Sequence, residues 1–166
     1  NVKRISGFIT KKVADKLGEL FSKDRADFES KWSDLGIFVK YGMLSDEKFY
    51  EKAIKYALVK NLEGQFFPIE EYVEKVKPTQ TDKHNKTVLI YANQPDTQHT
   101  LIEACKDYGY EVLIMDQPMI DGPFMQQLEY KLGSVVFVRV DSDTINNLIQ
   151  KDEKPELGQK KFEINE

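Results

Sequence analysis

Cysteine and histidine are scarce in this sequence: its 166 residues hold one cysteine, Cys105, and two histidines, His84 and His99. A single thiol cannot build an internal disulfide framework, and low cysteine usage is typical of a reducing compartment. Structural zinc sites use four cysteine or histidine ligands in most proteins, so these three side chains do not favour one. The sequence therefore argues against the disulfide-rich and zinc-stabilised classes of small protein.

Long apolar runs and a strong excess of one charge are also absent. The apolar stretches are only a few residues long, as in Val-Leu-Ile-Tyr-Ala at 88–92, whereas a membrane span needs about 20. The net charge of −4 argues against a protein that binds nucleic acid through its overall charge. We therefore expect neither a membrane nor a nucleic acid as a partner.

The composition that is present, with 40% hydrophobic and 31% charged residues, is typical of a soluble globular protein. Residues 1–60 carry 13 basic against 9 acidic side chains, whereas the remainder carries 11 against 19. This asymmetry predicts two sub-regions with different surfaces. Because the chain begins with Asn1 instead of methionine, we expect a piece of a longer protein.

The first sixty residues show the period of amphipathic helices. We expect one helix with an apolar stripe, a second capped by Asp24, and a third capped by Ser45, with breaks at Gly36 and Gly42. None of the three could bury its stripe alone, so residues 1–60 are predicted to form a three-helix coil. The residues expected to be buried are Ile5, Phe8, Ile9, Val13, Leu17, Leu20, Phe21, Phe28, Trp32, Leu35, Phe49, Tyr50, Ala53, Ile54, Ala57 and Leu58.

From Asn61 to Gln150 the pattern changes to short apolar strands that alternate with helices. Continuous valine, isoleucine and leucine in such strands indicate a buried, mostly parallel sheet with right-handed crossovers. We therefore predict an α/β fold in which residues 61–150 form a small three-layer α/β/α unit. The predicted strands are 66–68, 88–92, 111–115 and 135–140, and the predicted helices are 69–76, 97–108, 121–132 and 143–150. Residues 151–166 are predicted to be a charged linker or tail.

The loops at the carboxyl ends of parallel strands are where a ligand of such a sheet would bind. The first loop, 93–96, has none of the glycines that let backbone N–H groups surround a pyrophosphate, and Asp96 is placed to cap the next helix. Asp116 and Asp141 follow the next two strands and could share a magnesium ion, as in a two-component receiver domain. A receiver-like or nucleotide-binding domain that uses these two aspartates is therefore the alternative function. Turn-forming and capping roles are the other interpretation of the same residues.

Nucleophilic catalysis has little support. Cys105 lies in the middle of a predicted helix with no identifiable base, and the serines show no nucleophile-elbow motif. We predict that this chain is not itself an enzyme and holds no cofactor or metal.

One segment, 117–125, is more apolar than a connection between a strand and a helix requires. Methionine and aromatic side chains at a surface adapt to varied partners. We therefore predict an apolar contact surface for polypeptides, although helical periodicity alone also allows Phe124 to lie in the core. The candidate contact residues are Met119, Ile120, Pro123, Phe124 and Tyr130, with Gln127 at the rim.

Several segments together resemble one known family. They are "ITKKVADKLGELF", "FESKWSDLGIFVKYG", "DEKFYEKAIKYALV", "IEEYVEKVKPTQ", "TVLIYA" and "YGYEVLIMDQPMIDGPFMQQLEY". In this order they resemble the middle segment of the heat-shock protein 90 chaperone family, in its bacterial HtpG form. The similarity runs from about Val2 to Gln150.

The resemblance implies that the whole protein is an ATP-driven, homodimeric chaperone of the cytoplasm. ATP and magnesium would bind an amino-terminal domain, and the dimer contact would lie in a carboxyl-terminal one, both outside this chain. The family's ATP-contacting arginine precedes the first helix, and neither Arg4 nor Arg25 matches it. This segment would contact unfolded or partly folded clients, with possible co-chaperones, and couple the flanking domains. The family often has an aromatic residue where this sequence has Pro123, one place before Phe124.

Overall fold

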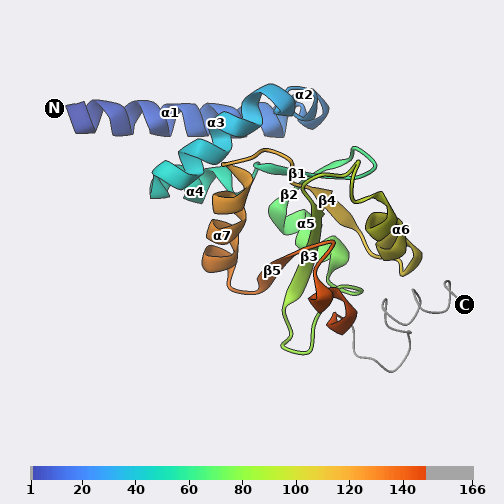
Figure 1. Cartoon of the computed structure of the whole chain (residues 1–166). Helices are drawn as coiled ribbons and strands as arrows, with labels where there is room; N and C mark the ends of the chain where they lie inside the picture. The colour runs from blue at the N-terminus through green and yellow to red at the C-terminus, as the bar shows by residue number, and fades with distance from the viewer. Residues whose placement is uncertain (1, 149–166) are drawn as a thin grey trace, which may run out of the picture.

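The computed structural model describes residues 2–148, with a helical coil at the amino-terminal end and an α/β unit after it (Figure 1). The coil consists of four helices. They are α1 (Val2–Lys23), α2 (Arg25–Ser30), α3 (Trp32–Ser45) and α4 (Glu47–Ala53). Residues 151–166, for which a charged tail is predicted, lie outside the described residues.

The coil differs from its prediction in helix number and in caps. The expected second helix is divided at Lys31 into α2 and α3, so the coil has four helices in place of three. Asp24 caps α2 as expected, since its side chain accepts a hydrogen bond from the Asp27 N–H. The cap of α4 is Asp46 and not Ser45, because the Asp46 carboxylate accepts the Phe49 N–H at 2.8 Å.

The two glycines expected to break the helix lie inside α3, where they allow close packing. A Cβ atom on Gly36 would lie 2.9 Å from the ring of Trp32, and one on Gly42 would lie 2.8 Å from the ring of Phe49. Both distances are too short for real Cβ contacts, so each glycine is needed for the approach of a buried aromatic ring. The helical hydrogen bonds continue through both positions.

Within residues 2–148 the sheet has five strands, in the order β2-β1-β4-β3-β5. Strand β3 pairs in parallel with β4 and β5, and β1 pairs antiparallel with β4 and β2. The strands are β1 (Leu58–Asn61), β2 (Phe66–Pro68), β3 (Thr87–Ala92), β4 (Val112–Ile114) and β5 (Val135–Arg139). Strand β1 includes Leu58, which the periodicity predicts in a helix, so the sheet begins before residue 61.

Helices cover both faces of this sheet. Side chains of Leu89 and Leu113 pack in one core with the coil, α5 (Ile69–Val76) and α7 (Asp121–Leu132). Val88 and Ile90 point to the opposite face, which α6 (His99–Asp107) and the short 3-10 helix η1 (Asp143–Asn147) cover. The predicted three-layer α/β/α architecture is therefore confirmed, with an antiparallel hairpin added to the parallel strands.

Strand β5 lies at one edge of the sheet. The backbone N–H of Phe137 points away from β3, and the Glu129 carboxylate of α7 accepts it at 3.1 Å. The outward edge of β5 is thus partly closed by a side chain from the neighbouring helix.

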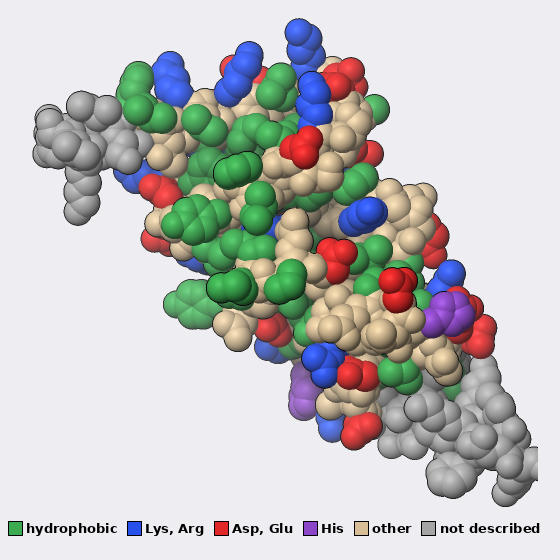
Figure 2. Space-filling model, turned by 45° about the horizontal axis from the view of Figure 1, so that its top comes forward, with side chains coloured by type: hydrophobic (Ala, Val, Ile, Leu, Met, Phe, Trp, Pro, Cys, Tyr) green, Lys and Arg blue, Asp and Glu red, His purple; other side chains and the backbone are tan. Residues whose placement is uncertain are grey.

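The apolar stripe predicted for α1 is only partly buried. Ala14 lies in the core, and Leu17 and Phe21 pack against it. By contrast, Phe8, Ile9, Val13 and Leu20 are exposed, which corrects the prediction for these four residues. The side chain of Ile5 lies outside the described residues. Hydrophobic side chains gather broadly over the coil half of the molecule (Figure 2).

Candidate functional site

The loop between β4 and α7 contains two of the residues predicted to contact polypeptides, Met119 and Ile120, and Met119 has an unusual main-chain conformation. Met119 has φ = 72°, in the left-handed region that residues with a side chain rarely adopt. Its side chain is 94% exposed. A large apolar side chain is therefore held in solvent by a strained backbone, and strain of this kind is concentrated where proteins contact their ligands.

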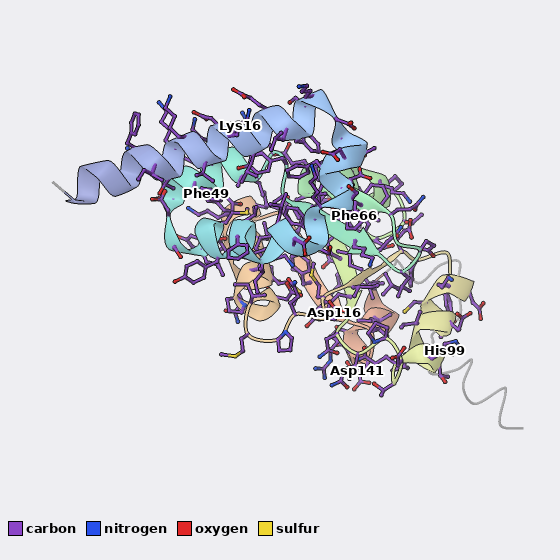
Figure 3. All side chains as sticks on the ribbon, turned by 90° about the horizontal axis from the view of Figure 1, so that it is seen from above. Lys16, Phe49, Phe66, His99, Asp116 and Asp141 are labelled. Atoms are coloured by element: carbon purple, nitrogen blue, oxygen red, sulfur yellow. The ribbon has the colours of Figure 1, made fainter. Side chains whose placement is uncertain are left out.

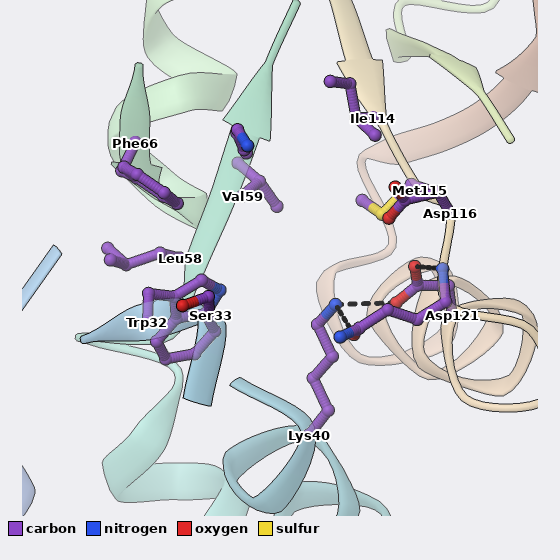
Figure 4. A pocket seen from close by; sticks show the side chains of 12 residues that line it. Trp32, Ser33, Lys40, Leu58, Val59, Phe66, Ile114, Met115, Asp116 and Asp121 are labelled. Atoms are coloured by element: carbon purple, nitrogen blue, oxygen red, sulfur yellow. Dashed lines mark hydrogen bonds and ion pairs between the residues drawn. The ribbon is translucent and has the colours of Figure 1, made fainter. Parts of the chain in front are cut away.

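A buried ion pair holds the base of this loop against the coil. Lys40 Nζ of α3 lies 2.6 Å from Asp121 Oδ1 and donates to Gln117 Oε1 at 3.0 Å (Figure 4). The other Asp121 oxygen accepts the Gln117 N–H at 2.9 Å. Only 9% of the Lys40 side chain and 4% of the Asp121 side chain are exposed. These contacts fix both ends of the loop segment that carries Met119.

The remaining candidate residues divide between surface and core. Pro123 is exposed, Ile120 is half-buried, and Tyr130 is 84% exposed. Gln127 is half-buried and its Nε2 donates to the Met43 carbonyl at 2.7 Å, so it anchors α7 to α3.

Phe124 is fully buried, so its prediction as a surface contact is wrong. Its ring packs in the core, and Lys40 Nζ lies 5.4 Å from the ring centroid. The reason is helical geometry: Phe124 shares a face of α7 with Leu128, which points to the sheet.

A hollow of about 200 Å³ lies beside the Lys40–Asp121 pair, between α3, β1 and the end of β4. Trp32 lies on its wall and is itself 7% exposed, so it packs between helices as its apolar spacing predicts. The lining residues are Trp32, Ser33, Lys40, Leu58, Val59, Lys60, Phe66, Ile114, Met115, Asp116, Gln117 and Asp121.

The alternative site at Asp116 and Asp141 is not favoured by the geometry. These aspartates follow β4 and β5, and β3 lies between those strands (Figure 3). Asp141 is paired with Arg139 at 2.6 Å, and this hydrogen bond holds the pKa of the Asp141 carboxyl below its usual value. Within residues 2–148, no group of three or more His, Cys, Asp or Glu side chains could hold a metal ion.

Nor does the neighbouring loop offer a phosphate site. The cap position of α6 is occupied by Gln98, whose Oε1 accepts the Gln94 N–H, so the expectation that Asp96 caps this helix is wrong. The loop residues present, without glycine, do not fit the phosphates of ATP.

Cys105 lies in the core between α6 and the sheet. Burial raises the pKa of its thiol to about 11, so the reactive thiolate is disfavoured at neutral pH. This environment is that of a packing residue and not of a nucleophile.

Sequence reasoning missed Lys40, because nothing local marks a lysine in the middle of a helix as the partner of an aspartate 81 residues away. The exposed Ile37, Phe38 and Tyr41 of α3 were missed as well. A signal for these did exist: three consecutive apolar residues, 37–39, cannot all point to one side of a helix.

Comparison with known proteins decides the family. The family model described as "Hsp90 protein" matches residues 1–165. The chain belongs to the Hsp90 family. The resemblance noted in its sequence is thereby confirmed.

Two bacterial relatives within the Hsp90 family are named chaperone protein HtpG. The protein from Bacteroides fragilis strain YCH46 is 49% identical over 154 residues, which cover 93% of this chain and 22% of that protein. The one from Porphyromonas gingivalis strain ATCC 33277 is 48% identical over 157 residues, covering 95% and 23%. This Hsp90-family chain therefore spans less than a quarter of the length of these relatives.

A solved structure shares the fold. The middle domain of a putative heat shock protein of Plasmodium falciparum matches with a TM-score of 0.65 at 18% identity, covering 86% of this chain and 60% of that one. This Hsp90-family chain thus has the fold of part of that middle domain. In the described part of the chain, every helix is too short or too polar to cross a bilayer.

Proposed function

We propose that this chain is the part of an ATP-driven chaperone that contacts partly folded client polypeptides, through the β4–α7 loop and the outward side of α7. The observation that carries the proposal is Met119, which is 94% exposed at φ = 72°. Membership of the Hsp90 family and the likeness to a middle domain support it.

The conformation of this loop favours contact with other polypeptides and lowers the stability of the chain. A non-glycine residue in the left-handed region costs about 1–3 kcal/mol, and exposing a methionine forgoes the gain from burying it. The Lys40–Asp121 pair maintains that conformation. Methionine is flexible and polarizable, so it can adapt to many apolar sequences, as a client-binding surface requires.

The whole protein, by its family, would be a homodimer of the cytoplasm that binds ATP with magnesium and works with co-chaperones. We place its ATP site and its dimer contact outside this chain, which would then have no catalysis of its own. Between residues 61 and 148 the α/β unit offers no glycine-rich loop to hold phosphates, which supports that division.

Within the whole protein, residues 1–60 would form the coil, 61–150 the small α/β/α unit and 151–166 a linker. Besides client contact, the chain would couple the domains on either side of it. The shared core of the coil and the sheet supports this role, because motion of one would carry the other.

Binding of a permanently unfolded polypeptide tests the proposed surface. Fluorescently labelled, reduced and carboxymethylated α-lactalbumin is titrated with the chain, and its anisotropy is measured. The double variant Met119→Ser with Tyr130→Gln should weaken binding about tenfold, since it removes the two most exposed apolar side chains of the site.

The matched control is Phe8→Gln, which removes an aromatic side chain 62% exposed on α1. It should leave the affinity unchanged. Unaltered binding by the Met119 and Tyr130 variant, with its thermal unfolding intact, would show that this surface does not bind clients.

A further inference from the structure

Helix α3 carries a second group of exposed apolar side chains, which we call the α3 strip: Ile37, Phe38 and Tyr41. Phe38 is 75% exposed, Tyr41 66% and Ile37 45%. Ile37 and Phe38 are adjacent, and Tyr41 follows them by four and three positions, so all three side chains project from one side of the helix. Neighbouring Val39 and Met43 point into the core, which leaves the α3 strip without a partner in residues 2–148.

Three contacts show that α7 lies alongside α3 and the beginning of α4. Lys40 pairs with Asp121 at 2.6 Å, the Met43 carbonyl accepts from Gln127 at 2.7 Å, and Glu47 pairs with Lys131 at 2.7 Å. The partners advance together along both segments, so the two helices run in the same direction. We call the line of these contacts the α3–α7 seam.

Exposed apolar residues of both helices, though not the whole α3 strip, flank this seam on its solvent side. On α7, positions 123, 127 and 130 fall within about 60° of arc, so Pro123 and Tyr130 border Gln127. On α3, positions 37, 40, 41 and 44 fall within about 100°, so Ile37 and Tyr41 border Lys40. Phe38 lies about 160° of arc from Lys40, so it points away from the seam. Since Lys40 and Gln127 both cross the seam, the apolar residues on either side of it belong to one face.

We infer that Ile37 and Tyr41 of the α3 strip form the second half of the client-binding surface, so that a client segment lies across the α3–α7 seam and contacts both helices. This inference rests on the proposed function, which concerns the β4–α7 loop and α7 alone. The ligand is an apolar, unfolded stretch of polypeptide.

The charges along the seam favour an apolar ligand. Lys40 is neutralised by Asp121, and Glu47 by Lys131. The cross-helix charges are therefore engaged within the chain, and the surface between them can select for apolar character instead of charge.

The size of the face distinguishes an unfolded segment from a second copy of this chain. A fully exposed aromatic side chain offers roughly 150–250 Å², so the α3 strip exposes on the order of 400 Å². A stable interface buries about 800 Å² on each partner. Even with part of α7 added, the face suits a weak and transient contact, as an unfolded segment makes, better than a lasting dimer.

The test uses the same unfolded α-lactalbumin probe with the double variant Ile37→Gln and Tyr41→Gln. Glutamine retains helix propensity, so α3 should persist, and circular dichroism checks it. We expect affinity to fall about fivefold to tenfold. In the unaltered chain, backbone amide resonances of residues 37–41 should shift on addition of the probe.

The outcomes separate the inference from the proposed function. If the α7 variant weakens binding and the α3 variant does not, the inference is wrong and the proposed function stands. If neither variant has an effect, both are wrong. An effect of the α3 variant alone would overturn both the α7 assignment and the shared face.

Two further controls test whether the contact is specific and whether its occupant is an unfolded chain. An equal loss with Phe8→Gln would mean general adhesion to exposed aromatics and would overturn the inference. So would concentration-dependent dimerisation in sedimentation that Ile37→Gln and Tyr41→Gln abolish, because the occupant would then be a second copy.

Discussion

In the α/β unit, helices cover both faces of the sheet, whereas the coil leaves one side of α1 and of α3 in solvent. Among the described residues, most of the large exposed hydrophobic side chains belong to the coil, and only Met119 and Tyr130 belong to the α/β unit. The α/β unit is therefore close to self-sufficient in burial. The coil leaves more apolar surface in solvent, and this surface is available to a partner.

A buried ion pair lies at the junction between the two regions, and breaking it should have the largest effect on stability. Lys40→Met leaves Asp121 buried without its cation, which typically costs about 3–5 kcal/mol. For a chain of this size we expect the midpoint of thermal unfolding to fall by roughly 10 °C. Circular dichroism measures it.

Two comparisons sharpen this experiment. Adding Asp121→Leu to Lys40→Met should recover much of the loss, because an apolar pair replaces a lone buried charge. Lys31→Ala removes an exposed pair with Asp27 and should cost less than about 1 kcal/mol. Equal effects of Lys31→Ala and Lys40→Met would mean that the junction does not depend on the buried pair.

Packing inside the coil gives the next largest expected effect. Gly42→Ala would place a Cβ 2.8 Å from the buried ring of Phe49, so it should destabilise the chain by about 1–3 kcal/mol. Gly7→Ala, in α1, meets nothing within 4 Å and should stabilise by up to about 1 kcal/mol through helix propensity. Urea unfolding measures the change in the free energy of unfolding for both variants. A stabilising Gly42→Ala would contradict the close packing of α3 on α4.

The smallest expected effect on stability comes from the β4–α7 loop. It tests whether the strained conformation of Met119 lowers stability while favouring contact with clients. Met119→Gly relieves the left-handed backbone strain and should raise the free energy of unfolding by about 0.5–1 kcal/mol. The same change should weaken binding of the unfolded probe. The same two measurements on Pro118→Ala, at the neighbouring loop residue, show whether a substitution elsewhere in the loop also changes stability and binding. Loss of stability in Met119→Gly would rule out strain at this position.

The α/β unit could be predicted from sequence far better than the coil. The bounds of β2, α5 and α7 agree with the prediction, because Pro68, the helical spacing of 69–76 and the turn glycine Gly133 are local signals. In the coil, amphipathic period located the helices but could not show the division at Lys31 or the strand that begins at Leu58. The division at Lys31 and the start of β1 at Leu58 depend on packing partners that are distant in sequence.

The candidate site was predicted in part for the same reason. Met119, Pro123 and Tyr130 do lie at the surface, as an apolar loop and one helical face suggest. Phe124 does not, because its direction depends on where the sheet lies. Lys40 and the α3 strip become visible only when α3 and α7 are placed side by side.

The carboxylate of Glu129, which accepts the Phe137 N–H at the outer edge of β5, has a consequence for the client contact proposed above. Extended polypeptides tend to add themselves to open sheet edges, and such recruitment is a route to aggregation. An incoming strand would have to displace this acceptor and bury its charge before it could pair there. The β5 edge thus does not offer the Phe137 N–H to a client that binds the helices in the way proposed.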